Sequence, residues 1–93
     1  MVIGAAKVEL EITDGLTLKD KRHVVKSLLD RMRSRFNVSC AEVERQDSRR
    51  LATLGVAAVS SSEGFVREVL EKVQDLIESE PRAAVLGWEV EVM

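Results

Sequence analysis

Residues 51–60 are Leu-Ala-Thr-Leu-Gly-Val-Ala-Ala-Val-Ser, and this stretch decides the fold. In an extended strand, alternate side chains point to opposite faces. Small and apolar residues occupy both faces here, with Leu54, Val56 and Ala58 on one and Gly55, Ala57 and Val59 on the other. A strand that is apolar on both faces is typical of the interior of a sheet, so the pattern predicts a central strand.

The chain leaves this strand through Ser60-Ser61-Ser62-Glu63, where a serine precedes a glutamate by three positions. That spacing is typical of a capping box, so we predict that Ser60 caps a helix that runs to about residue 79. Apolar residues at three- and four-residue spacing predict its buried stripe: Val66, Val69, Leu70, Val73, Leu76 and Ile77. Pro81 prevents further helix, and alternation over residues 83–93 predicts a last strand.

Three elements are predicted on the N-terminal side. Residues 44–50 are too polar to be buried and indicate a hairpin loop. Residues 38–45 indicate a strand whose apolar positions change phase, which favours either a bulge or two half-apolar faces. Residues 18–36 indicate a helix with Thr17 as its N-cap, and residues 2–12 alternate as a strand does. The apolar stripe of this helix is Val24, Val25, Leu28, Leu29, Met32 and Phe36.

The resulting order is β-α-β-β-α-β within one domain, residues 1–93. Each β-α-β half needs a right-handed crossover, which places both helices on the same face of the sheet. We therefore predict an α+β fold, the ferredoxin-like βαββαβ sandwich, with a four-stranded antiparallel sheet of order 4-1-3-2. Its central strands are then residues 2–12 and 51–60, and Val24, Leu28, Met32, Val66, Leu70 and Val73 face the sheet.

Composition narrows the class of protein. The 93 residues carry a formal net charge of −2 and a single cysteine, so no internal disulfide can form and we expect a cytoplasmic protein. The apolar N-terminal segment lacks a preceding basic region, which indicates neither a signal peptide nor a membrane span.

No catalytic constellation is evident in the sequence. One histidine, His23, and one cysteine, Cys40, cannot assemble a zinc site, and Cys40 is expected to be a small core residue. An acylphosphatase-like enzyme would need an arginine after the first strand, and an RNA-recognition motif would need aromatic residues on the central strands; neither is present. We therefore expect no enzyme activity, no cofactor and no metal.

Charge is divided unequally between the two helices. Residues 18–36 contain seven bases against two acids, a formal charge of +5, whereas residues 63–80 contain two bases against six acids, a charge of −4. Bases at a helix N-terminus oppose the helix dipole but suit a bound phosphate. The predicted anion-binding residues are Lys19, Lys21, Arg22, Lys26 and Arg33. A solvated helix face without a ligand is the alternative explanation.

The face of the sheet away from the helices is predicted to be flat and apolar. Its side chains would be small, and such patches mark interfaces. The predicted interface residues are Ile3, Ala5, Val43, Ala57 and Val59. Scattered apolar surface residues without a partner are the alternative explanation.

Several of these segments together resemble a known family. Leu18-Lys19-Asp20-Lys21-Arg22, Phe36-Asn37-Val38-Ser39 and Leu54-Gly55-Val56 are similar to the bacterial YlxP-like family, a domain of unknown function, over essentially the whole chain. The resemblance implies a ferredoxin-like fold and a cytoplasmic protein whose gene lies among translation and ribosome-maturation genes. It implies no catalytic residues.

One leading hypothesis and one main alternative follow for the function. The first is a non-catalytic module that binds RNA or a ribosomal particle through the basic first helix. The second is a homodimeric interaction or regulatory protein that associates through the outer sheet face, without a role in nucleic-acid binding. An enzyme or small-ligand protein whose site the sequence does not reveal is a third alternative.

Overall fold

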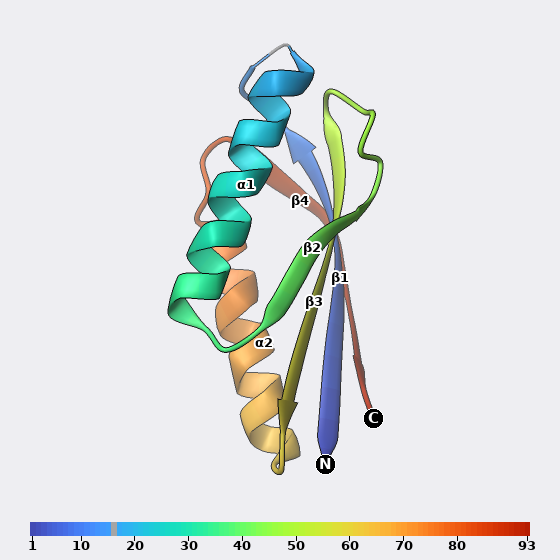
Figure 1. Cartoon of the computed structure of the whole chain (residues 1–93), viewed down its shortest axis with the longest axis vertical. Coiled ribbons are helices and arrows are strands. Elements are labelled where there is room, and N and C mark those ends of the chain that lie inside the picture. The colour runs from blue at the N-terminus through green and yellow to red at the C-terminus, as the bar shows by residue number, and fades with distance from the viewer. Residues whose placement is uncertain (16) are drawn as a thin grey trace.

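The computed structural model describes residues 1–15 and 17–93 and shows the predicted order of elements (Figure 1). These are β1 (Val2–Ile12), α1 (Leu18–Arg35), β2 (Ser39–Glu44), β3 (Leu51–Ser60), α2 (Glu63–Glu78) and β4 (Ala83–Val92). All neighbouring strands pair antiparallel in the order β2-β3-β1-β4. The predicted fold and the central positions of β1 and β3 are therefore confirmed.

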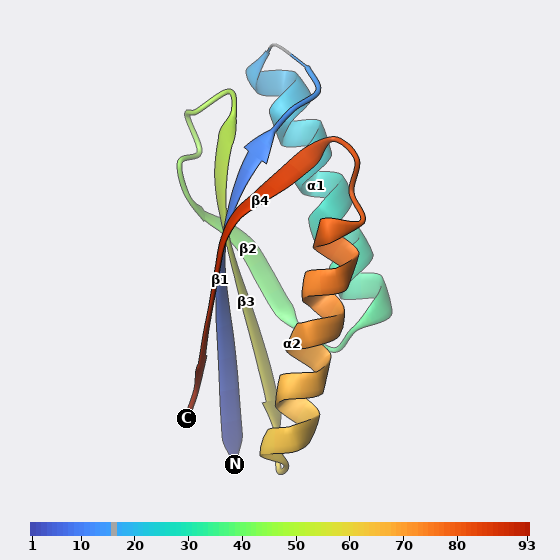
Figure 2. The ribbon, with the colours of Figure 1, turned by 180° about the vertical axis from the view of Figure 1, so that it is seen from behind.

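Both helices cover one face of the twisted sheet, and the other face has no helix over it (Figures 1 and 2). α1 packs mainly against β2, whereas α2 packs against β1, β3 and β4. The two helices contact each other only slightly. The molecule is elongated, with extents of 42 × 21 × 17 Å. Within residues 1–15 and 17–93, no helix is both long enough and apolar enough to cross a membrane.

The core lies between the sheet and the two helices, as predicted. The six helix residues expected to face the sheet are all buried: Val24, Leu28, Met32, Val66, Leu70 and Val73. From the sheet, Val8 and Leu54 meet them without solvent exposure. Gly4 allows α2 to pack close to β1, because a Cβ atom there would collide with Val66.

The two helix starts differ in how well the sequence predicted them. Thr17 is the N-cap of α1, and its hydroxyl accepts from the Asp20 N–H at 3.0 Å while the Asp20 carboxylate accepts from the Thr17 N–H. The prediction that Ser60 caps α2 is wrong: the cap is Ser62, whose hydroxyl accepts from the Phe65 N–H at 3.2 Å. Ser60 instead ends β3, opposite Val2.

The second strand contains a β-bulge, but the bulge follows Glu42, beyond the change of apolar phase between Cys40 and Ala41, where the pairing with β3 is regular. The pairing of β2 with β3 shifts between Glu42 and Glu44, so that Val43 is the extra residue. Glu42 points toward α1, where it meets Lys21, and Glu44 points toward Lys7 of β1. The next residue, Arg45, adopts a left-handed backbone with φ of 64° and begins the hairpin loop.

A buried carboxylate joins α1 to the end of the α2–β4 connection. Glu80 pairs with Arg31 of α1, and with Nε of Arg82 at 2.8 Å. It also accepts from the backbone N–H of Arg82 at 3.0 Å. Because Arg82 and Arg31 donate to the ionised carboxylate, the pKa of Glu80 falls to about 2.

Candidate functional site

Four of the five predicted anion-binding residues lie exposed along one flank of α1. Lys19, Arg22, Lys26 and Arg33 recur at three-, four- and seven-residue spacing, which keeps them on one side of a helix. Arg33 shows which side this is, because its Nη2 donates to the carbonyl of Cys40 in β2 at 2.6 Å. The basic flank therefore borders the β2 edge of the sheet.

The bases of this flank differ in how far they are neutralised. Lys26 pairs with Asp30 at 2.8 Å, and Arg33 lies 3.7 Å from the same carboxylate. The hydrogen bond from Lys26 lowers the pKa of Asp30, which keeps that carboxylate ionised. Among the described residues, Lys19 and Arg22 have no ion-pair partner, so their full charge is open to a ligand.

The fifth predicted residue, Lys21, is not on the surface, and its assignment to the anion-binding set is wrong. Its side chain is 0% exposed and its Nζ lies 2.7 Å from Oε2 of Glu42 and 2.7 Å from the carbonyl oxygen of Arg45. The sequence contained the signal for this position. Lys21 precedes Val25 by four residues and Leu28 by seven, so it belongs to the apolar stripe.

The hairpin loop between β2 and β3 adds three bases that the sequence analysis did not assign to a site. Arg45, Arg49 and Arg50 are all exposed, and Asp47 is the one acid within residues 45–50. The contact between Lys21 and the Arg45 carbonyl brings this loop beside the first turns of α1 (Figure 1). We name the exposed bases on this flank of α1 and in the loop the basic edge: Lys19, Arg22, Lys26, Arg33, Arg45, Arg49 and Arg50.

The predicted interface residues share the uncovered face of the sheet. Ile3 of β1 lies opposite Val59 of β3, and Ala5 lies opposite Ala57. The bulged Val43 lies over Gly55, where a Cβ atom would come within 3.1 Å of its Cγ1. Val59 is 60% exposed and Val43 is 48% exposed, so about half of each of these apolar side chains is open to solvent.

The single cysteine of the chain lies in the core. Cys40 is buried, its thiol lies 3.7 Å from the carbonyl of Leu29, and burial raises the pKa of this thiol. Such a thiol is mostly protonated at neutral pH and is a weak nucleophile. Within residues 1–15 and 17–93, no group of three or more His, Cys, Asp or Glu side chains is placed to hold a metal ion.

Two designed proteins have the same architecture. A de novo designed protein with ferredoxin fold, LFR1 1, aligns over 98% of this chain and 86% of its own, with a TM-score of 0.61 and 14% identity. The de novo designed protein Foldit4 aligns over 98% of this chain and 96% of its own, with a TM-score of 0.54 and 11% identity. These likenesses show the fold alone: the chain is a ferredoxin-like sandwich.

Sequence comparison gives the family. The model described as "Protein of unknown function (DUF503)" matches residues 3–90. The uncharacterized protein YlxP of Bacillus subtilis (strain 168) is 41% identical over 80 residues, which cover 86% of this chain and 87% of that protein. The chain belongs to the DUF503 family, and the resemblance to the YlxP-like family is confirmed.

Proposed function

We propose that this protein is a non-catalytic module that binds the phosphate backbone of structured RNA, free or in a ribosomal particle, through the basic edge. The observation that carries the proposal is the gathering of seven exposed bases from α1 and the β2–β3 loop in a protein with a formal net charge of −2. Lysine and arginine side chains bind phosphates through charge-assisted hydrogen bonds.

Charge elsewhere in the molecule restricts how an RNA would approach. The surface of α2 carries exposed acids, among them Glu63, Glu68 and Glu71. α2 lies over β1, β3 and β4, away from the β2 edge of the sheet (Figure 2). A phosphate backbone is therefore attracted at one side and repelled at the other, so binding should be one-sided.

Removing the two unpaired bases of the basic edge on α1, Lys19 and Arg22, should weaken RNA binding without unfolding the protein. In the double variant Lys19→Ala, Arg22→Ala, the slope of log K against log salt should fall in magnitude by about two units for an RNA hairpin. Thermal stability should stay the same or rise slightly, because cations are removed from the positive end of the α1 dipole. Fluorescence anisotropy at several salt concentrations and co-sedimentation with ribosomes measure the two forms of binding.

The matched control is Arg67→Ala, Lys72→Ala on α2, which removes the same net charge. Both residues are exposed and already paired with glutamates, at 3.0 Å and 3.1 Å. This control should bind RNA as wild type does. The proposal fails if wild type does not bind RNA, or if the two double variants lose the same affinity.

A second function, homodimerisation through the outer sheet face, is favoured by the exposure of Val43 and Val59 beside Ile3, Ala5 and Ala57. On this hypothesis, Ala57→Glu should convert a dimer to a folded monomer, because a dimer would bury the new carboxylate without a partner. Sedimentation velocity measures the oligomeric state, and circular dichroism shows whether the variant is folded.

The control Ser61→Glu adds the same charge outside the outer sheet face and should leave the dimer intact. A wild-type monomer at high micromolar concentration contradicts this hypothesis.

A further inference from the structure

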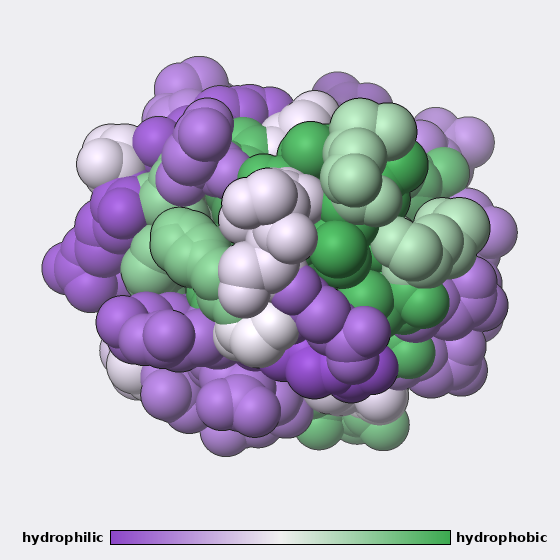
Figure 3. Space-filling model, turned by 90° about the horizontal axis from the view of Figure 1, so that it is seen from below, coloured by the Kyte–Doolittle hydropathy of each residue, from purple (hydrophilic) through white to green (hydrophobic). Residues whose placement is uncertain are grey.

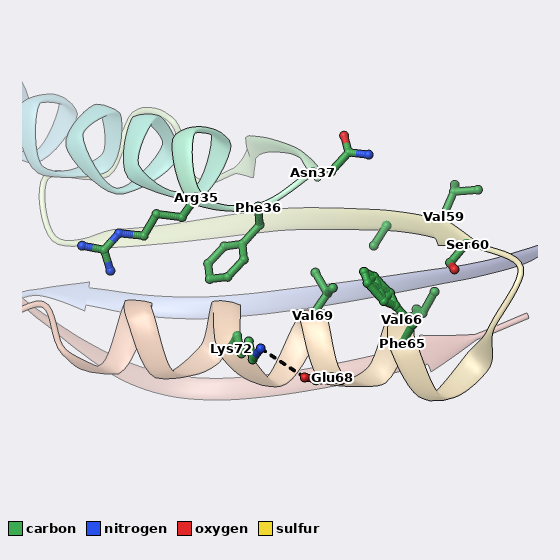
Figure 4. Close-up of a pocket in the computed structure, with 11 residues that line it drawn as sticks. Arg35, Phe36, Asn37, Val59, Ser60, Phe65, Val66, Glu68, Val69 and Lys72 are labelled. Atoms are coloured by element: carbon green, nitrogen blue, oxygen red, sulfur yellow. Dashed lines mark ion pairs between the residues drawn. The ribbon is translucent and has the colours of Figure 1, made fainter.

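A cleft opens at the end of the molecule opposite the β2–β3 loop (Figure 4). Its origin lies in the lengths of the elements. β2 pairs with β3 only as far as Ser39 opposite Ala57, and α1 ends at Arg35, so the last residues of β3 extend beyond both. α2 begins on the other side of this space, and the volume left between them is about 310 Å³.

The floor and walls of the cleft are apolar. Ala58 of β3 and Val66 of α2 are buried, and Val69 borders the cleft one helical turn further on. The ring of Phe36 projects from the end of α1 toward α2 (Figure 4). Phe65 is 50% exposed at the far end. Figure 3 views this end of the molecule and shows apolar side chains gathered between hydrophilic ones.

Two cations border the cleft near Phe36. Arg35 comes from the last turn of α1 and, among the described residues, has no ion-pair partner. Lys72 comes from α2 and pairs with Glu68 at 3.1 Å, with both side chains largely exposed. Arg35, Lys72 and Glu68 together carry a formal charge of +1. This charge matches a monoanion better than a dianion. Asn37 and Ser60 add hydrogen-bonding groups at the rim.

We infer that this cleft binds a small amphipathic carboxylate, with its apolar tail between Phe36, Val66 and Val69 and its carboxylate at Arg35 and Lys72. The volume lies at the lower end of the range for small-molecule sites, and an apolar lining with a few convergent polar groups is typical of them. Clefts between helices are also common locations for such sites. None of these residues belongs to the basic edge, so the inference is independent of RNA binding.

A titration with octanoate, followed by the backbone amide signals in ¹H–¹⁵N NMR spectra, tests the inference. The signals of Phe36, Ser60 and Val69 should shift and saturate. Octanol has the tail alone and should bind more weakly, and acetate has the head alone and should produce no saturable shift. Arg35→Gln should lower the affinity for octanoate about tenfold, which corresponds to about 1.4 kcal/mol for a charge-assisted hydrogen bond.

Two further variants separate the cleft from general effects. Arg67→Gln removes an exposed cation from α2 outside the cleft and should leave the affinity unchanged. Val69→Trp should fill the cleft and abolish binding, and its amide spectrum also reports whether the variant is folded. If Val69→Trp does not fold, Arg35→Gln decides, because Arg35 is exposed and outside the core. The inference is overturned if octanoate shifts no cleft signals, if acetate shifts the same signals equally, or if Arg35→Gln binds octanoate as wild type does.

Discussion

Lys21→Met is expected to lower the free energy of unfolding by about 3–5 kcal/mol, because it leaves a largely buried carboxylate without its counter-charge. The Glu42 side chain is 15% exposed, and among the described residues its Oε2 is paired with the Lys21 ammonium alone. The carbonyl of Arg45 loses its lysine donor in the same change. Domains of this size are stable by about 5–15 kcal/mol, so the loss is a large fraction of the total.

Urea denaturation at neutral pH measures this effect. The double variant Lys21→Met, Glu42→Met should recover most of the lost stability, because a buried ion pair replaced by apolar residues of similar volume is often neutral. Lys26→Met is the matched control on the same helix, since that lysine is exposed and its pair with Asp30 contributes less than about 1 kcal/mol. If Lys21→Met lowers the free energy of unfolding by less than about 1 kcal/mol, the Lys21–Glu42 pair does not stabilise the fold as expected.

The second large effect concerns acid stability and depends on Glu80. Its pKa is about 2 in the folded protein, against an ordinary value of 4.5, and its side chain is 2% exposed. A carboxylate with a lowered folded-state pKa contributes stability above its unfolded pKa, and this contribution disappears as the pH falls. We therefore expect about 2–3 kcal/mol of stability that is present above pH 5 and lost between about pH 4.5 and pH 2.

Unfolding measured from pH 7 to pH 2 in wild type and in Glu80→Gln tests this expectation. The variant should be less stable by about 2–3 kcal/mol at pH 7, and the difference should shrink toward pH 2, where Glu80 begins to bind a proton in wild type. Glu71→Gln removes an exposed carboxylate from α2 and should leave the pH dependence unchanged. A constant difference between wild type and Glu80→Gln at all pH values would contradict the role of ionised Glu80.

The fold was predictable because local patterns and topology agreed. The end of β1 follows from an alternation that stops at Ile12, and the end of β3 follows from an apolar run that stops at Val59, one residue before the strand ends. A bulge in β2 was one of two alternatives that the sequence left open, and it lies after Glu42 instead of at the change of apolar phase. The start of α2 was harder to place, because three serines stand in a row and each can cap a helix. The choice of Ser62 depends on how far β3 continues its pairing with β1, which is not a local property.

The candidate sites were less predictable, since they depend on contacts between distant segments. Lys21 was interpreted as a surface base because it is charged. Its position on the helix, in line with the apolar stripe, indicated burial instead. Arg45, Arg49 and Arg50 were recognised as polar loop residues, but their position beside α1 depends on the buried contact with Lys21. The cleft depends on where α1 ends relative to β3. The Arg31–Glu80 pair joins residues 49 positions apart, beyond any local pattern.

The hydrogen bond from Arg33 to Cys40 has a consequence for the growth of the sheet. An edge strand presents backbone groups on which a second chain can build a further strand. β2 is a poor template, because it is six residues long, is interrupted by the bulge, and has its Cys40 carbonyl occupied by a side chain of the same molecule. β4 is ten residues long and forms the other edge. In a symmetric antiparallel pairing of two copies centred on Val90, Glu89 of one copy would lie opposite Glu91 of the other, so like charges disfavour that pairing at the edge whose backbone groups are open.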